Sequence, residues 1–202
     1  MLVKARMTRN PVTITPDVSI SEAHRLMKEH SFRRLPVVQG GKLIGIVTEK
    51  ELQQVSPSKA TTLSVFELNY LLEKTTIQEA MSRDPITVQD DDLIEKAALL
   101  MRTNKVGALP VMHGDRLVGI ITESDIFDTF IDIMGFRNPG VRLALQLEDQ
   151  AGSISAVTKI ISEKGGNITH MALYGDGELV IRIAEEHVQD IVAALTQAGY
   201  MT

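Results

Sequence analysis

The sequence predicts a mixed α/β (α+β) protein. We expect two β-α-β-β-α repeats packed with pseudo-twofold symmetry, followed by a ferredoxin-like βαββα(β) domain. Three observations predict this fold: an internal repeat, an alternation of short apolar strands with amphipathic helices inside each copy, and a change of pattern after residue 140.

The repeat has an offset of 74 residues and needs no gap. Residues 7–52 align with residues 81–126, and 18 of the 46 positions are identical. The shared positions include Leu-Pro-Val at 35 and 109, Gly-Ile at 45 and 119, and Thr-Glu at 48 and 122. Self-similarity of this kind is the signature of a duplicated structural unit.

Each copy predicts the same series of elements. In the first copy we expect a short strand at 12–14 and then a helix that Ser19 and Glu22 cap together. Strands at 35–38 and 43–47 flank a Gly-Gly hairpin turn, and a second helix opens at Thr48. A unit of this size buries too little surface to be stable alone. The copies should therefore pack together, sheet against sheet, and leave a cleft near their shared axis.

The segments outside the repeat complete the domain plan. Ser56-Pro57-Ser58 should break the chain, and the apolar residues of 63–72 predict a helix that covers an exposed face. The last helix of the second copy should continue through Met134 and stop at Gly135. We expect domains at 1–60, 61–136 and 141–202.

The C-terminal part has its own β-α-β-β-α pattern. Strands are predicted at 141–147, 168–173 and 179–183, and helices at 154–161 and 188–195. Only Tyr200-Met201-Thr202 remain for a sixth element, so the last strand is short, missing or borrowed from another chain.

Composition narrows the classes of function. The chain has 202 residues, a net charge of −5, no cysteine and 4% aromatic residues. The lack of cysteine excludes disulfides, cysteine-zinc sites and thiol catalysis. The acidic balance disfavours nucleic-acid binding, and the apolar runs are too short for a membrane span or a signal peptide. We expect a soluble cytoplasmic protein.

No catalytic or metal-binding pattern is found. The sequence has no phosphate-binding glycine loop and no nucleophile elbow, so we predict neither an enzyme nor a catalytic cofactor. The histidines lack metal-like spacing, and the Asp90-Asp91-Asp92 run is typical of a helix N-terminus. The histidines are His24, His30, His113, His170 and His187.

Motifs in the repeat resemble a pair of CBS domains, also called a Bateman module. These motifs are the Leu-Pro-Val-Val and Gly-Ile-Val-Thr segments at 35–38 and 45–48 and their copies at 109–111 and 119–125. The segments 149–154 and 165–168 resemble an ACT domain. The order of these domains, with the linker at 56–58 and Phe127-Asp128-Thr129-Phe130, is similar to a family of acetoin utilization proteins, which implies a role in acetoin catabolism.

The resemblance to CBS pairs implies an adenosine-type ligand in the cleft: AMP, ADP, ATP or S-adenosylmethionine. Thr122 matches the family position that contacts phosphates, and Asp125 matches the position that contacts the ribose hydroxyls. A carboxylate suits two hydroxyl donors, and free amides at a helix N-terminus suit an anion. The same two residues also form an ordinary helix cap, and one residue can serve both purposes.

The first copy carries a different set of candidates. Thr48 and Glu51 occupy the matching positions, and the longer glutamate makes the ribose contact doubtful. Arg33 and Arg34 stand where CBS pairs place phosphate-binding bases, although a solvated or ion-paired surface would explain them as well.

Family geometry also lets the first strand of one copy line the site of the other. This crossing would bring Thr15 towards Asp125 and Gln89 towards Glu51. We therefore expect two unequal sites, one with the ribose acid and the other with the phosphate bases.

In the ACT-like part, Asp149, Gly152 and Asn167 match the positions that hold amino-acid effectors between subunits. A helix cap and a polar turn residue would explain them as well. Taken together, the sequence predicts a non-catalytic sensor that forms a homodimer and regulates an unknown protein. The alternative is a scaffold that binds no small molecule.

Overall fold

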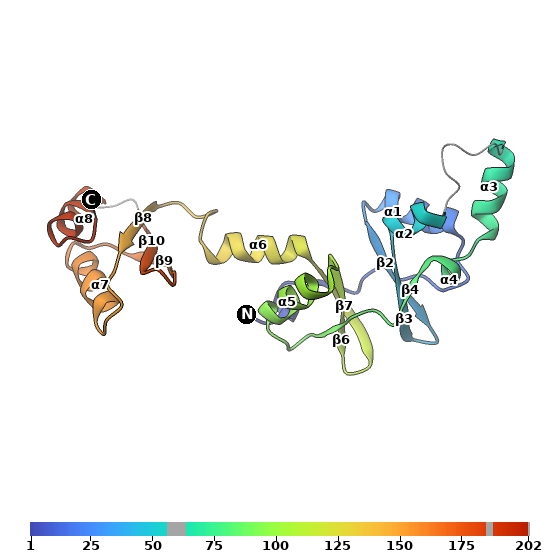
Figure 1. The fold of residues 1–202 in the computed structure, drawn as a ribbon, viewed down its shortest axis with the longest axis horizontal. Coiled ribbons are helices and arrows are strands. Elements are labelled where there is room, and N and C mark those ends of the chain that lie inside the picture. The colour runs from blue at the N-terminus through green and yellow to red at the C-terminus, as the bar shows by residue number, and fades with distance from the viewer. Residues whose placement is uncertain (56–63, 185–187, 202) are drawn as a thin grey trace. The chain divides into compact units, whose positions relative to one another are not determined.

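The computed structural model describes residues 1–55, 64–184 and 188–201 (Figure 1). They form two compact units, Met1–Ile126 and Phe127–Thr202. The first unit has two hydrophobic cores, one for each copy of the repeat, and the second unit has one. The predicted chain break at 56–58, the predicted boundary at residue 60 and His187 lie outside the described residues. The three domain ranges expected from the sequence remain a prediction.

The first unit contains both copies of the repeat, each built around a β-hairpin (Figure 1). The first copy consists of α1 (Ile20–Glu29), β2 (Arg34–Gln39), β3 (Lys42–Thr48) and α2 (Glu49–Val55). The second consists of α5 (Ile94–Asn104), β6 (Ala108–His113), β7 (Arg116–Thr122) and α6 (Glu123–Ile133), whose later turns belong to the second unit. The duplicated plan predicted from the sequence is confirmed.

Short strands exchange between the two copies. The strand β1 (Thr8–Arg9) opens the first copy but pairs with β7 of the second. In the same way β4 (Ser82–Arg83) pairs with β3 of the first copy, while β5 (Val88–Gln89) stays with β6. The sheet orders are β2-β3-β4 and β1-β7-β6-β5. Each sheet is therefore completed by a strand from the neighbouring repeat.

The strand predicted at 12–14 is wrong in extent. Only Ile14 forms a bridge, in parallel with Val37, and Val12 is exposed. The regular pairing occurs a few residues earlier, in β1, where the chain already runs along the other repeat.

Equivalent apolar positions fill the two cores. The predicted helix face is buried in both copies, and Ser19 accepts a hydrogen bond from the amide of Glu22 as its capping role requires. The buried pairs are Ile20 and Ile94, Ala23 and Ala97, Met27 and Met101, Leu35 and Leu109, and Val37 and Val111. The short helix η1 (Val3–Ala5) adds Val3 to the second core.

The helix between the copies is α3 (Val65–Lys74), followed by α4 (Ile77–Ala80). The expectation that α3 covers an exposed face with its aromatic residues is wrong, because Phe66 is 89% exposed and Tyr70 is 61% exposed. Leu72 packs against the first core. Leu63 lies outside the described residues.

The second unit is a three-stranded antiparallel sheet in the order β8-β10-β9, with two helices against one face. Its elements are β8 (Val141–Gln146), α7 (Ser153–Glu163), β9 (Ile168–Leu173), β10 (Glu178–Ile183) and α8 (Val188–Gln197). After α8 no strand forms within the described residues, although the Tyr200 carbonyl accepts the amide of Gln146 at 3.3 Å.

Among the described helices, none combines the length and the apolar character that crossing a membrane requires.

Candidate functional site

Two cavities related by the internal repeat lie between the two copies in the first unit. The first has a volume of about 570 Å³ and the second about 350 Å³. A shift of 74 residues converts much of one lining into the other: Thr48 becomes Thr122, and Ser82 corresponds to Thr8. The predicted cleft between the copies is therefore present as a pair of equivalent hollows.

The first cavity combines several basic groups with two glutamates. Thr48, Glu49 and Glu51 come from the start of α2, and Ser82–Ile86 from the crossing segment. The basic side chains around it are Arg33, Arg34, Lys50, Arg83 and Lys105. This set favours an anionic ligand, because the cations outnumber the carboxylates, which are Glu49, Glu51 and Asp84.

The second cavity is smaller and less charged. Thr122, Glu123 and Ser124 line it from the start of α6, and Thr8, Pro11 and Val12 from the crossing segment. Arg33 and Arg34 reach this cavity too, together with Phe32. The expected division, with acid in one site and bases in the other, is thus incomplete: both cavities share the same two arginines.

Thr122 and Asp125 cap the N-terminus of α6. Asp125 Oδ2 accepts from the Thr122 amide at 2.7 Å and from the Thr122 hydroxyl at 2.8 Å. Thr122 lines the second cavity, whereas Asp125 is not among the residues that line either cavity. The capping interpretation of this pair is therefore present in the structure.

The first copy repeats this cap with a longer acid. Glu51 Oε2 accepts from the Thr48 amide at 2.7 Å, and its Oε1 accepts from the hydroxyl of Ser82 on the crossing strand. Glu51 itself lines the first cavity. The acid of the first copy is therefore hydrogen-bonded to Ser82, which lies on the crossing strand of the second copy.

Arg34 lies at the junction of the two cavities. Its Nη1 donates to the carbonyl of Gly107 in the second copy, a carbonyl that also accepts the amide of Glu123. Burial lowers the pKa of Arg34, an effect that Glu123 partly offsets and Arg33 reinforces. The guanidinium remains charged, so it would stabilise an anionic ligand in addition to the carboxylate of Glu123.

Thr15 and Gln89 do not line either cavity. The Thr15 side chain hydrogen-bonds to Asp17, and Gln89 bonds to the backbone of Gly114 at the β6–β7 turn. The crossing residues that reach the other repeat are instead Thr8 and Ser82. Thr8 and Ser82 lie seven positions before Thr15 and Gln89, where β1 and β4 pair with the other repeat. A ligand contact of Thr15 or Gln89 stays a prediction.

Other lining residues escaped sequence reasoning. Ser31 and Lys105 occupy equivalent positions before β2 and β6 and share a left-handed backbone, with φ of 56° and 55°. Asn10 and Asp84 form a second such pair, at 48° and 50°. Asparagine and aspartate tolerate this conformation, so only the second pair carried a signal in the sequence.

In the second unit the candidate effector residues are exposed. Gly152 is the N-cap of α7 with φ of 94°, and Asp149 lies in the turn before it. The Asn167 carbonyl accepts the amide of Ala184 at 3.2 Å. The polar groups of Asp149 and Asn167 face solvent, and their role stays a prediction. No group of three or more potential metal ligands occurs among the described residues.

Comparison with known proteins identifies the class. The CBS domain model matches residues 3–57 and 77–132, and the ACT domain model matches 141–199. The chain therefore belongs to the CBS domain family and carries a C-terminal ACT domain. Among solved structures it is similar to a Vibrio cholerae protein provisionally assigned as the acetoin utilization protein AcuB, with 30% identity, a TM-score of 0.56, and coverage of 68% of this chain and 95% of that one.

Two other similar structures contain ligands. The CBS domain pair of protein MJ0100, solved with 5′-methylthioadenosine and S-adenosyl-L-methionine, is 31% identical, with a TM-score of 0.54 and coverage of 64% of this chain and 95% of that one. CBSX2 in complex with AMP is 28% identical, with a TM-score of 0.55 and coverage of 65% and 97%.

One curated relative is much longer than the matched region. An uncharacterized protein of Methanocaldococcus jannaschii is 36% identical over 127 residues, which are 61% of this chain but only 45% of that protein.

Proposed function

We propose that this chain is a non-catalytic sensor that binds an adenine nucleotide between its two CBS domains. The observation that carries the proposal is the pair of equivalent cavities, each with a threonine at a helix N-terminus and both reached by Arg33 and Arg34. The complexes of similar CBS pairs with AMP and with S-adenosyl-L-methionine support it.

The chemistry of each group fits a nucleotide. The helix N-termini at Thr48 and Thr122 and the two arginines suit phosphate or another anion. Asp125 can hold its cap and accept ribose hydroxyls together, because a carboxylate offers about four lone-pair sites. Glu51 is already shared between Thr48 and Ser82, so we propose that the second cavity binds ribose better than the first.

The decisive test is calorimetric titration of the full chain with AMP, ADP, ATP and S-adenosylmethionine. We expect saturable binding of at least one of them, without turnover of bound ATP. Absence of heat with all four at millimolar concentration would remove the proposal, and ATP hydrolysis would replace it with an enzyme.

Further parts of the proposal depend on resemblance. We propose a homodimer that regulates an unidentified protein in acetoin utilization, and an amino-acid effector at Asp149, Gly152 and Asn167 of the ACT domain. A ligand in the cleft could bias a partner by about 1–3 kcal/mol, the usual coupling between two sites. Light scattering checks the dimer, and titration with amino acids checks the effector.

The second candidate function is a ligand-free scaffold. The internal engagement of both acids favours it, since Asp125 and Glu51 each complete a helix cap without any nucleotide. Thermal melting separates the two functions: a ligand at about 100 times its dissociation constant adds about 2.7 kcal/mol to stability, whereas a scaffold shows no shift.

A further inference from the structure

A row of basic side chains crosses the sheet of the second unit. Arg182 on β10 lies directly opposite Arg142 on β8 and directly opposite His170 on β9. These residues alternate with the buried Leu143, Ile181 and their neighbours, so the row lies on the face away from α7 and α8. Arg182 and Arg142 are like charges directly opposite one another, which destabilises a sheet, so this pair needs a compensating reason.

One carboxylate contacts the row at its Arg142 end. Glu178 is 3.8 Å from Arg142 Nη2, at the limit of an ion pair. On α6, Asp128 and Asp132 are both paired with Arg137. None of the residues that line the cavity described next is acidic.

An apolar cavity of about 290 Å³ adjoins this row. The next row of the sheet is apolar, because Val180 faces Ala172 on one side and Ala144 on the other. The end of α6 and the turn after it supply the walls, through Phe130, Ile131, Ile133, Met134 and Phe136. Phe130 and Phe136 are largely exposed there, so the cavity has a basic end and a hydrophobic body.

The backbone around the cavity holds Arg182 in place. Its Nη1 donates to the carbonyls of Asn138 at 3.2 Å and Gly140 at 2.9 Å, and its buried Nε has no hydrogen-bond partner in the described structure. The guanidinium is thus fixed at the cavity by neutral backbone acceptors. Buried donors without partners are rare and call for an explanation.

We propose that this cavity binds a small monocarboxylate with an apolar body. The carboxylate lies against Arg142 and Arg182, where charge-assisted hydrogen bonds are strongest, and the apolar body lies over Ala172 and Val180. The ring nitrogens of His170 already contact Asn138 and Thr169. The site differs from the predicted effector site at Asp149, Gly152 and Asn167. An amino acid is disfavoured because its ammonium group would meet the basic row.

The probe is 3-phenylpropanoate, titrated into the isotope-labelled full chain and followed by amide NMR. We expect saturable shifts confined to residues 130–136, 142, 170–172 and 180–182. Acetate, which lacks the apolar body, and 3-phenylpropylamine, which has the opposite charge, should each bind at least about tenfold more weakly.

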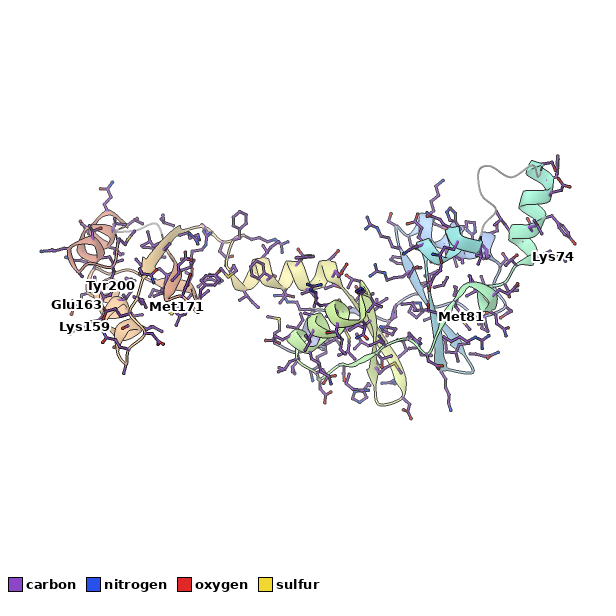
Figure 2. The ribbon with its side chains drawn as sticks, in the orientation of Figure 1. Lys74, Met81, Lys159, Glu163, Met171 and Tyr200 are labelled. Atoms are coloured by element: carbon purple, nitrogen blue, oxygen red, sulfur yellow. The ribbon has the colours of Figure 1, made fainter. Side chains whose placement is uncertain are left out.

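Two variants test the assignment. Arg142→Gln should weaken binding of 3-phenylpropanoate by about tenfold or more, because it removes one charge-assisted bond. Lys159→Gln is the matched control: Lys159 pairs with Glu163 on α7, across the sheet from the cavity, and Figure 2 labels both residues. This control should bind like the unmodified chain, and spectra of both free variants report their folding.

Several results would overturn the proposal. They are no saturable shift at 10 mM probe, equal binding of the amine, shifts centred on residues 33–34 and 107 instead, or equal affinities of the two variants. None of these results bears on nucleotide binding in the first unit, which titration with nucleotides tests separately.

Discussion

Asp125 is the residue in which capping and ligand binding can be separated. Its Oδ2 accepts two hydrogen bonds from Thr122, and an asparagine oxygen could accept both without the negative charge. We expect Asp125→Asn to melt close to the unmodified chain but to bind nucleotide at least about tenfold more weakly. Asp125→Ala should lose binding and also about 1 kcal/mol of stability. Calorimetry and thermal melting give both values, and unchanged affinity in Asp125→Asn would leave the residue with its cap alone.

Arg34 allows the phosphate contribution to be isolated. It contacts Gly107 across the two copies and lines both cavities. We expect Arg34→Gln to weaken AMP binding by about tenfold or more and to leave adenosine binding nearly unchanged, because adenosine has no phosphate. Equal losses for AMP and adenosine would instead indicate damage to the cleft as a whole.

The contacts of Asp92 should make the free energy of unfolding depend on pH. Its pKa is lowered, mainly by the ion pair with Lys96 at 2.8 Å and then by the amide of Gln89. A lowered carboxyl pKa stabilises the fold above the ordinary value, and this contribution is lost as pH falls through the lowered pKa. Asp92→Asn should therefore be less stable by about 0.5 kcal/mol at pH 7 and equal near pH 2. Denaturant unfolding at both pH values checks this, and an equal deficit at both would contradict it.

At the scale of elements, the crossing strands are held by two equivalent close contacts. Gly45 on β3 lies under Met81, which precedes β4, and Gly119 on β7 lies under Met7, which precedes β1. A Cβ on Gly119 would come within 2.5 Å of Met7 Sδ and 3.0 Å of the Thr8 carbonyl. Figure 2 labels Met81 beside β3 and β4 in the first copy. Each crossing strand thus needs a glycine opposite its methionine.

We expect Gly119→Ala to destabilise the first unit by about 1–3 kcal/mol, the usual cost of overpacking. Adding Met7→Ala should recover part of this loss, because the Met7 side chain that collides with the new Cβ is then absent. Denaturant unfolding of the two single variants and the double variant measures the coupling. Simple additivity would show that Met7 is not the obstacle.

The sequence predicted long elements better than short ones. The apolar positions Ile20, Ala23 and Met27 recur at helical spacing, and burial made them the core face. By contrast β1 and β4 have two residues each, too few for any periodicity, and their partners are far away in sequence. The same limit explains why Thr8 and Ser82 were not foreseen as lining residues. The aromatic residues of α3 suggested burial, but apolar side chains also remain at protein surfaces.

The candidate site was predicted in part, for a related reason. Thr48 and Thr122 end β3 and β7, and Arg33 and Arg34 stand at the start of β2, so their position next to regular elements could be anticipated. That both cavities share the arginines could not, because this depends on how the two copies pack. The left-handed residues Ser31 and Lys105 also gave no compositional signal.

At the scale of the whole molecule, the cores and the cavities of the first unit are separate from those of the second. The nucleotide cavities lie within Met1–Ile126, and the basic row lies within Phe127–Thr202. We expect a bound nucleotide to slow amide hydrogen exchange first at residues 33–34, 107 and 122–124. Exchange measured by mass spectrometry with and without AMP checks this. Slower exchange confined to residues 141–201 would contradict this prediction, because the nucleotide would then bind in the second unit.

The exchange of β1 and β4 has a consequence for how this architecture could arise. A single ancestral repeat would expose the sheet edge that the other repeat now covers. Two identical peptides could each pair a short strand with the exposed edge of the other. Gene fusion would then convert an obligate pair of small chains into one polypeptide without altering any contact. Separate peptides ending at Val55 and starting at Ser64 should, by the same logic, reassemble when mixed.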